Sequence, residues 1–155
     1  MHASDRKPVE TFNDLIGINN NRIECYSFAS KQNNSGILRT LFGRLVETSL
    51  SCNQELITEV YKLGGVPREG TLGTSSFFRA WLRVHAALVN GHNGSVIDAC
   101  HDAECIVRVS YSRIMLSNWE YLNTLQKDML SSQLQRMRYD FNQVSNVSMV
   151  FAPAA

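Results

Sequence analysis

Apolar residues recur every three or four positions along most of the chain, which is the period of one face of an α-helix. The first such stripe comprises Phe12, Ile16, Asn19, Ile23 and Tyr26. It predicts a helix that begins near Pro8, because proline is favoured in a first helical turn. A second stripe covers residues 37–63 and ends at Gly64 and Gly65, a pair typical of a left-handed C-terminal cap.

Three more helices are predicted after the turn-rich segment VPREGTLGTSS. A short helix covers residues 77–91 and should bury Trp81 at least partly. A long helix should begin at Ser95, and another at Ser117, because each is followed three residues later by an acidic residue, as in a capping box. The ends, 1–7 and 146–155, lack this periodicity, so we expect them to be disordered or frayed. No segment shows the alternation of a strand.

The lengths of the connections predict how the four long helices are joined. The first connection and the last are short, so each should join an antiparallel hairpin. The middle connection is long and contains the short helix, so it can cross over along the bundle. This arrangement predicts an all-α, ferritin-like four-helix bundle, with residues 1–155 forming a single domain.

Composition and charge exclude several classes of partner. The chain has 15 basic and 14 acidic residues, a net charge of +1, so no basic field would attract nucleic acid or an anionic membrane surface. No apolar run reaches the length that spans a bilayer. The first ten residues lack the apolar centre of a signal peptide, so the expected location is the cytoplasm.

The cysteines are scattered and predict buried free thiols. They are Cys25, Cys52, Cys100 and Cys105, and none forms a CxxC pair. A disulfide framework or a zinc knuckle would need a different spacing.

Four segments resemble a known group of proteins. They are LIGINNNRIECY (15–26), ELITEVYKLGGVP (55–67), RAW (79–81) and ACHDAE (99–104). In these segments the chain resembles a bacterial family of ferritin-like four-helix-bundle proteins of unknown function, and more distantly the rubrerythrins. The resemblance covers the chain from about residue 9 to 144 and implies the same bundle.

Rubrerythrins hold two metal ions with a Glu on the first helix of each hairpin, and a Tyr follows seven residues later. The resemblance places Asn19 and Tyr26 at one such pair of positions and Glu104 and Tyr111 at the other. The Glu-x-x-His pairs of the second and fourth helices would fall near Ser49 and Cys52 and near Leu130 and Gln133, or Leu134 and Met137. One carboxylate is too few for a dinuclear site. We therefore expect neither a metal ion nor another cofactor.

The same positions predict a buried polar layer without metal. Its expected members are Asn19, Glu104, Tyr26, Tyr111 and Ser49. The two leading helices should be diagonal neighbours, so that the Asn19 amide can hydrogen-bond the Glu104 carboxylate. With only neutral partners around Glu104, a Glu104→Gln substitution should be tolerated.

Three functions agree with these patterns. The first is a non-enzymatic helical-bundle protein with a degenerate ferritin-like centre, no catalytic residues and a tendency to self-associate. The alternative is a metal-binding protein or oxidoreductase with a rearranged site around Glu104 and His101, which share a helix face. The third is a carrier whose core holds a small apolar ligand.

Overall fold

The computed structural model describes residues 1–72 and 75–152 of the 155-residue chain. The elements in this part are η1 (Ala3–Asp5), α1 (Arg6–Gln32), α2 (Gly36–Lys62), α3 (Ser75–Asn90), α4 (Asn93–Ser117), η2 (Trp119–Tyr121) and α5 (Thr124–Val150). The described residues contain no strand, so the prediction of an all-helical protein is confirmed. None of the described helices is both long and apolar enough to cross a membrane.

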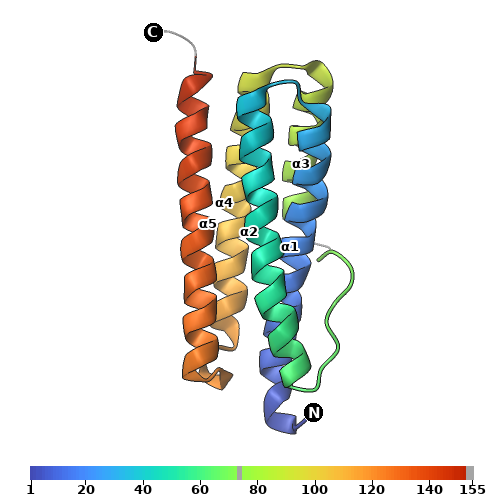
Figure 1. The fold of residues 1–155 in the computed structure, drawn as a ribbon, viewed down its shortest axis with the longest axis vertical. Coiled ribbons are helices and arrows are strands. Elements are labelled where there is room, and N and C mark those ends of the chain that lie inside the picture. The colour runs from blue at the N-terminus through green and yellow to red at the C-terminus, as the bar shows by residue number, and fades with distance from the viewer. Residues whose placement is uncertain (73–74, 153–155) are drawn as a thin grey trace.

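The four long helices lie side by side (Figure 1). The chain runs along α1, returns along α2, crosses back, runs along α4 in the direction of α2 and returns along α5. Helix α3 lies in the crossover and packs against α4 and α1. Helix α1 packs against both α2 and α4, and α5 packs against the same two helices. The leading helices α1 and α4 are therefore neighbours in the bundle, and the expected diagonal placement is wrong.

The ends of α2 follow the sequence pattern. Ser35 precedes the helix, and its hydroxyl accepts a hydrogen bond from the backbone N–H of Leu38 at 3.3 Å. At the other end Gly64 adopts φ +78°, a left-handed conformation that glycine reaches without strain. The backbone N–H of Gly65 then donates to the carbonyl of Val60. The predicted glycine cap is therefore confirmed.

The two predicted capping boxes are wrong. Helix α4 begins earlier, and His92 caps it by accepting a hydrogen bond from the backbone N–H of Ser95 at 3.0 Å. Ser117 is still inside α4, and the capping box of α5 is formed by Asn123 and Gln126. For α5 the sequence pattern failed because the turn η2 lies between the two helices and moves the capping residue from Ser117 to Asn123. Helix α5 also continues to Val150, where we had expected a frayed end.

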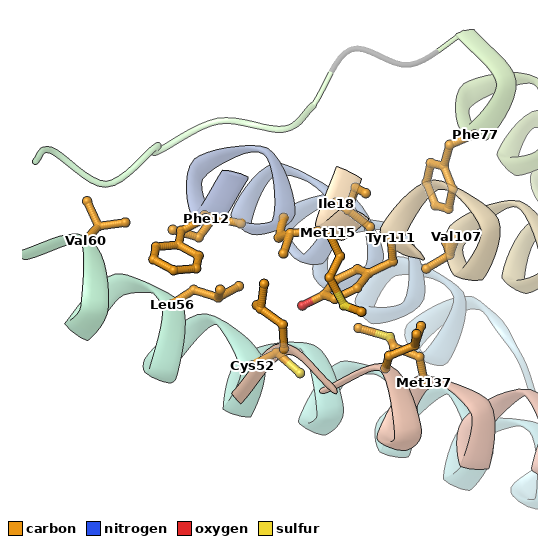
Figure 2. Close-up of a cluster of buried hydrophobic side chains, with 14 of the residues drawn as sticks. Phe12, Ile18, Cys52, Leu56, Val60, Phe77, Val107, Tyr111, Met115 and Met137 are labelled. Carbon is orange, nitrogen blue, oxygen red and sulfur yellow. The ribbon is translucent and has the colours of Figure 1, made fainter. Parts of the chain in front are cut away.

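The core contains two apolar clusters. One surrounds Phe12 and Leu56 and includes Phe77, which reaches from α3 toward α4 (Figure 2). The other surrounds Phe42 and includes Tyr26, whose ring stacks on Phe42 at a centroid distance of 5.8 Å. Trp81 is half-buried, as expected, and packs against both clusters.

The asparagine-rich part of α1 holds the crossover in place. The side-chain amide of Asn13 donates to the carbonyl of Val66 at 3.1 Å, and its oxygen accepts from the backbone N–H of Arg68 at 2.8 Å. The amides of Asn20 and Asn21 donate to the carbonyls of residues 70 and 72 at 3.0 and 2.9 Å. These bonds fix residues 63–72, here called the crossover segment, against α1.

Gly17 allows this segment to approach α1 closely. The backbone N–H of Leu72 donates to the Gly17 carbonyl at 3.2 Å. A Cβ atom at Gly17 would lie 2.7 Å from the Leu72 Cβ atom, which is closer than two carbon atoms can approach without displacement. The run of asparagines therefore costs helix propensity in α1 but supplies amides that satisfy an otherwise irregular backbone.

Candidate functional site

The side chain of Arg22 lies at the centre of the bundle and is fully buried. Arginine is almost never found in this position unless its charge is paired. The guanidinium meets side chains from the other three long helices: Ser49 of α2, Glu104 of α4 and Asp140 of α5. Together with Tyr26, these residues are called the Arg22 cluster below.

The contacts of the guanidinium are close and directional. Nη2 lies 2.6 Å from Glu104 Oε1, and Nε lies 3.3 Å from Glu104 Oε2, so the carboxylate is held by two donors. Nη2 also donates to Asp140 Oδ2 at 3.1 Å, and Nη1 donates to Ser49 Oγ at 2.7 Å. A charge-assisted pair of this kind is among the strongest hydrogen bonds in proteins.

Burial and charge act in opposite directions on the Arg22 cluster. Burial tends to lower the pKa of Arg22, but the nearby Glu104 and Asp140 carboxylates outweigh it, so the pKa lies above its ordinary value. The guanidinium therefore stays charged. Burial raises the pKa of Asp140, and the charge of Arg22 opposes this effect only in part.

Tyr26 closes the cluster toward the apolar core. Its hydroxyl donates to Glu104 Oε2 at 2.8 Å, and the Cys100 thiol approaches the Tyr26 oxygen at 3.7 Å. Burial raises the pKa of the Tyr26 phenol well above its usual range and also raises the pKa of the Cys100 thiol. Both groups are neutral at pH 7, so neither is prepared to act as a nucleophile.

A second buried polar group lies further along the bundle and contains Asn19, Tyr111 and Gln133, here called the Tyr111 group. The Asn19 amide donates to the Tyr111 hydroxyl at 3.4 Å and to its own helix at the Leu15 carbonyl at 3.0 Å. The Tyr111 hydroxyl donates in turn to the side-chain oxygen of Gln133.

The Tyr111 group is neutral and nearly complete. The Gln133 amide donates to the Cys52 carbonyl at 3.4 Å and to the Glu55 carboxylate at 3.0 Å. Within the described residues, only the side-chain oxygen of Asn19 is left without a partner in this group. Burial raises the pKa of the Tyr111 phenol well above its usual range.

The five residues expected in one polar layer are all buried, but they divide between the two groups. Glu104, Tyr26 and Ser49 belong to the Arg22 cluster, and Asn19 and Tyr111 belong to the Tyr111 group. The expected bond between Asn19 and Glu104 is wrong. Instead, Asn19 of α1 bonds Tyr111 of α4, and Glu104 of α4 bonds Tyr26 of α1. Each polar residue is thus paired with the tyrosine of the other leading helix.

Arg22 and Asp140 were missed from the sequence, and Gln133 was expected only near a metal-ligand position of the fourth helix, not in a polar group. Arg22 lies three residues after Asn19 and four before Tyr26, a spacing that places it on the same helix face. Its charge made a solvent-exposed position the default expectation. Asp140 was missed because its neighbour Phe141 completes the apolar spacing of α5, yet Phe141 is only half-buried.

No family model, curated protein or solved structure matches this chain. Membership of the ferritin-like proteins therefore stays a prediction, supported by segments of sequence and by the path of the helices.

The described side chains are poorly arranged for a metal ion. They include no group of three or more His, Cys, Asp or Glu residues that could bind one. His101 is 39% exposed and its ring packs on Phe141 with centroids 4.7 Å apart, whereas the Glu104 oxygens face Arg22 and Tyr26. His101 and Glu104 therefore do not converge. All four thiols are free, with two buried and two half-buried.

Proposed function

We propose that this chain is a ferritin-like bundle in which the guanidinium of Arg22 takes the place of a dinuclear metal centre. On this proposal the chain is a non-enzymatic helical-bundle protein, and its central polar residues serve to hold the four helices in register. The observation that carries the proposal is the buried contact of Arg22 with Glu104 and Asp140.

The path of the chain supports the ferritin-like part of the proposal. Two antiparallel hairpins joined by one crossover, with the second and third long helices running in the same direction, is the connectivity of that group. The reciprocal bonds of Tyr26 with Glu104 and of Tyr111 with Asn19 support the paired positions that the resemblance implies.

The charges support the loss of metal chemistry. Two divalent ions bring several positive charges and need several carboxylates and imidazoles around them. The cluster offers two carboxylates, Glu104 and Asp140, and one permanent positive charge already lies between them. The residues present therefore do not fit a dinuclear centre, and the guanidinium supplies the cation that the carboxylates require.

Elemental analysis tests this proposal. Protein purified without chelator should carry far less than one equivalent of iron, manganese or zinc, and EDTA should not change its thermal unfolding midpoint. Near-stoichiometric metal that survives dialysis, with a lower midpoint in EDTA, would contradict the proposal.

The alternative with a rearranged site at Glu104 and His101 is less well supported, since the two side chains face different surroundings. It makes a separate prediction. If His101 is a ligand, His101→Ala should remove bound metal and lower stability together, whereas the proposal expects no change in metal content. Arg138→Ala, at an exposed position of α5, is the control.

Self-association stays a prediction of its own. Sedimentation velocity over a range of protein concentrations would test it, and a single monomeric species at all concentrations would contradict it.

A further inference from the structure

A pocket of about 630 Å³ lies outside the bundle core, between α1, the crossover segment and α3. The aromatic residues around it include Phe28 of α1 and Phe78, Trp81 and His85 of α3. Its position matters because the third expected function placed a ligand inside the core, whereas this pocket opens to solvent on the flank of the bundle.

The aromatic rings form a corner rather than a flat wall. Phe28 and Trp81 meet nearly at right angles, with an interplanar angle of 83° and centroids 6.1 Å apart. The His85 ring stacks on Phe28 at 5.5 Å. Phe78 is 59% exposed although it borders the pocket, which leaves its ring available to a ligand. Several aromatic rings grouped around one pocket are the usual surroundings of a methylated ammonium group.

The charge at the pocket is negative. Among the described lining residues, Glu24 is the only Asp, Glu, Lys or Arg. Glu24 is exposed and forms no ion pair with any described residue. Its field reaches into the pocket: burial chiefly, and Glu24 in addition, raise the pKa of the neighbouring Cys25 thiol to about 12. Burial disfavours any charge, so the preference for a positively charged ligand rests on the Glu24 carboxylate among the described lining residues.

We propose that this pocket binds an organic cation, with a methylated ammonium group held against Phe28 and Trp81 and balanced by Glu24. The apolar remainder of the pocket then accommodates the carbon skeleton of the ligand. An anionic ligand would meet Glu24 and no basic partner among the described lining residues. This pocket shares no residue with the Arg22 cluster, so its failure to bind would leave the proposed function untouched.

A matched pair of small molecules tests the proposal. Choline and 3,3-dimethylbutan-1-ol have nearly the same shape, but only choline carries a charge. Both are titrated into the Trp119→Phe protein, in which Trp81 is the remaining tryptophan and its fluorescence reports the pocket. Choline should bind saturably and about ten-fold more tightly than the alcohol, the ratio expected when one ammonium meets aromatic faces and a carboxylate. Equal binding would show an apolar site, and no binding of choline would refute the site altogether.

Two conservative variants separate the contributions. Phe28→Leu keeps an apolar side chain but removes a ring, and Glu24→Gln keeps the shape but removes the charge. Glu24→Gln should weaken choline binding several-fold and leave binding of the alcohol unchanged, whereas Phe28→Leu should weaken choline binding several-fold and binding of the alcohol less. Glu47→Gln removes a charge from an exposed position of α2 and should change neither. If Phe28→Leu and Glu24→Gln bind choline as the parent does, the proposal is wrong even though choline binds.

Discussion

The Arg22 cluster and the Tyr111 group occupy comparable positions in the bundle but solve the problem of buried polarity differently. Each contains a polar residue of one leading helix, the tyrosine of the other, and a residue from α5. In the Arg22 cluster the polar residue is Glu104 and the α5 residue is Asp140. In the Tyr111 group they are Asn19 and Gln133, both neutral amides.

This difference decides how much stability is lost when one residue of each group is replaced. Removing one partner of a buried ion pair leaves a charge that neither water nor protein stabilises, at a cost of about 3–5 kcal/mol. Removing one partner of a neutral hydrogen bond leaves a dipole unsatisfied, at a cost of about 1–3 kcal/mol. Damage to the Arg22 cluster should therefore cost more stability than damage to the Tyr111 group, although neither group need add much net stability to the intact protein.

The largest expected effect is that of Arg22→Met. This change leaves Glu104 and Asp140 buried without a cation, so the free energy of unfolding should fall by about 3–5 kcal/mol. Urea unfolding followed by circular dichroism measures it. Arg138→Met, at an exposed position of α5, should cost less than about 0.5 kcal/mol. Similar losses for the two variants would show that the guanidinium is not the buried anchor of the cluster.

Glu104→Gln should come next, at about 2–3 kcal/mol. Both Glu104 oxygens accept hydrogen bonds, from Arg22 on both sides and from Tyr26 on one, so a Gln amide must turn its NH₂ group toward a donor. The sequence-based expectation that Gln is tolerated assumed neutral partners and is reversed here. A variant as stable as the parent protein would restore that expectation.

The two tyrosines offer the most direct comparison of the Arg22 cluster with the Tyr111 group. Tyr26→Phe removes a bond to a carboxylate and should cost about 1.5–3 kcal/mol, whereas Tyr111→Phe removes bonds between neutral groups and should cost about 0.5–1.5 kcal/mol. Thermal and urea unfolding of both variants under identical conditions measure the difference. Equal costs, or a larger cost for Tyr111→Phe, would show that the Arg22 cluster is no more sensitive to the loss of a hydrogen bond than the Tyr111 group.

The smallest effect is a dependence on pH. Burial raises the folded-state pKa of Asp140 above 3.8, and Arg22 opposes this only in part. The stability contributed by this carboxyl is therefore fully present below pH 3.8 and is lost as the pH rises through the folded-state pKa. Asp140→Asn cannot titrate, so the stability of the parent relative to the variant should fall as the pH rises above 3.8 and through the raised folded-state pKa of Asp140. A relative stability that rises over this range would show that Arg22 dominates over burial.

The sequence predicts the helices well because each carries a long apolar stripe that buries itself against its neighbours. It predicts Glu104 and Tyr26 as buried because both lie on such stripes. It does not reveal Arg22, since an isolated helix cannot show that two carboxylates from α4 and α5 will meet the guanidinium. Asp140 is hidden for the same reason, because Arg22, its one partner of opposite charge among the described residues, is 118 positions away in the chain.

The start of α5 was predicted wrongly for a local reason. Ser117 and Glu120 have the spacing of a capping box, but so do Asn123 and Gln126 a few residues later. Sequence alone ranks the serine pair at least as highly. The structure selects the second pair because the turn η2 lies between the two helices.

The asparagine contacts of the crossover segment also affect how copies of this chain can associate. The crossover is the single covalent link between the two hairpins, so two molecules could exchange hairpins only if this link swung away from its own α1. Such a swing would break the amide bonds from Asn13, Asn20 and Asn21 and the close approach at Gly17. These contacts therefore oppose domain swapping, because they favour the packing of both hairpins within the same chain.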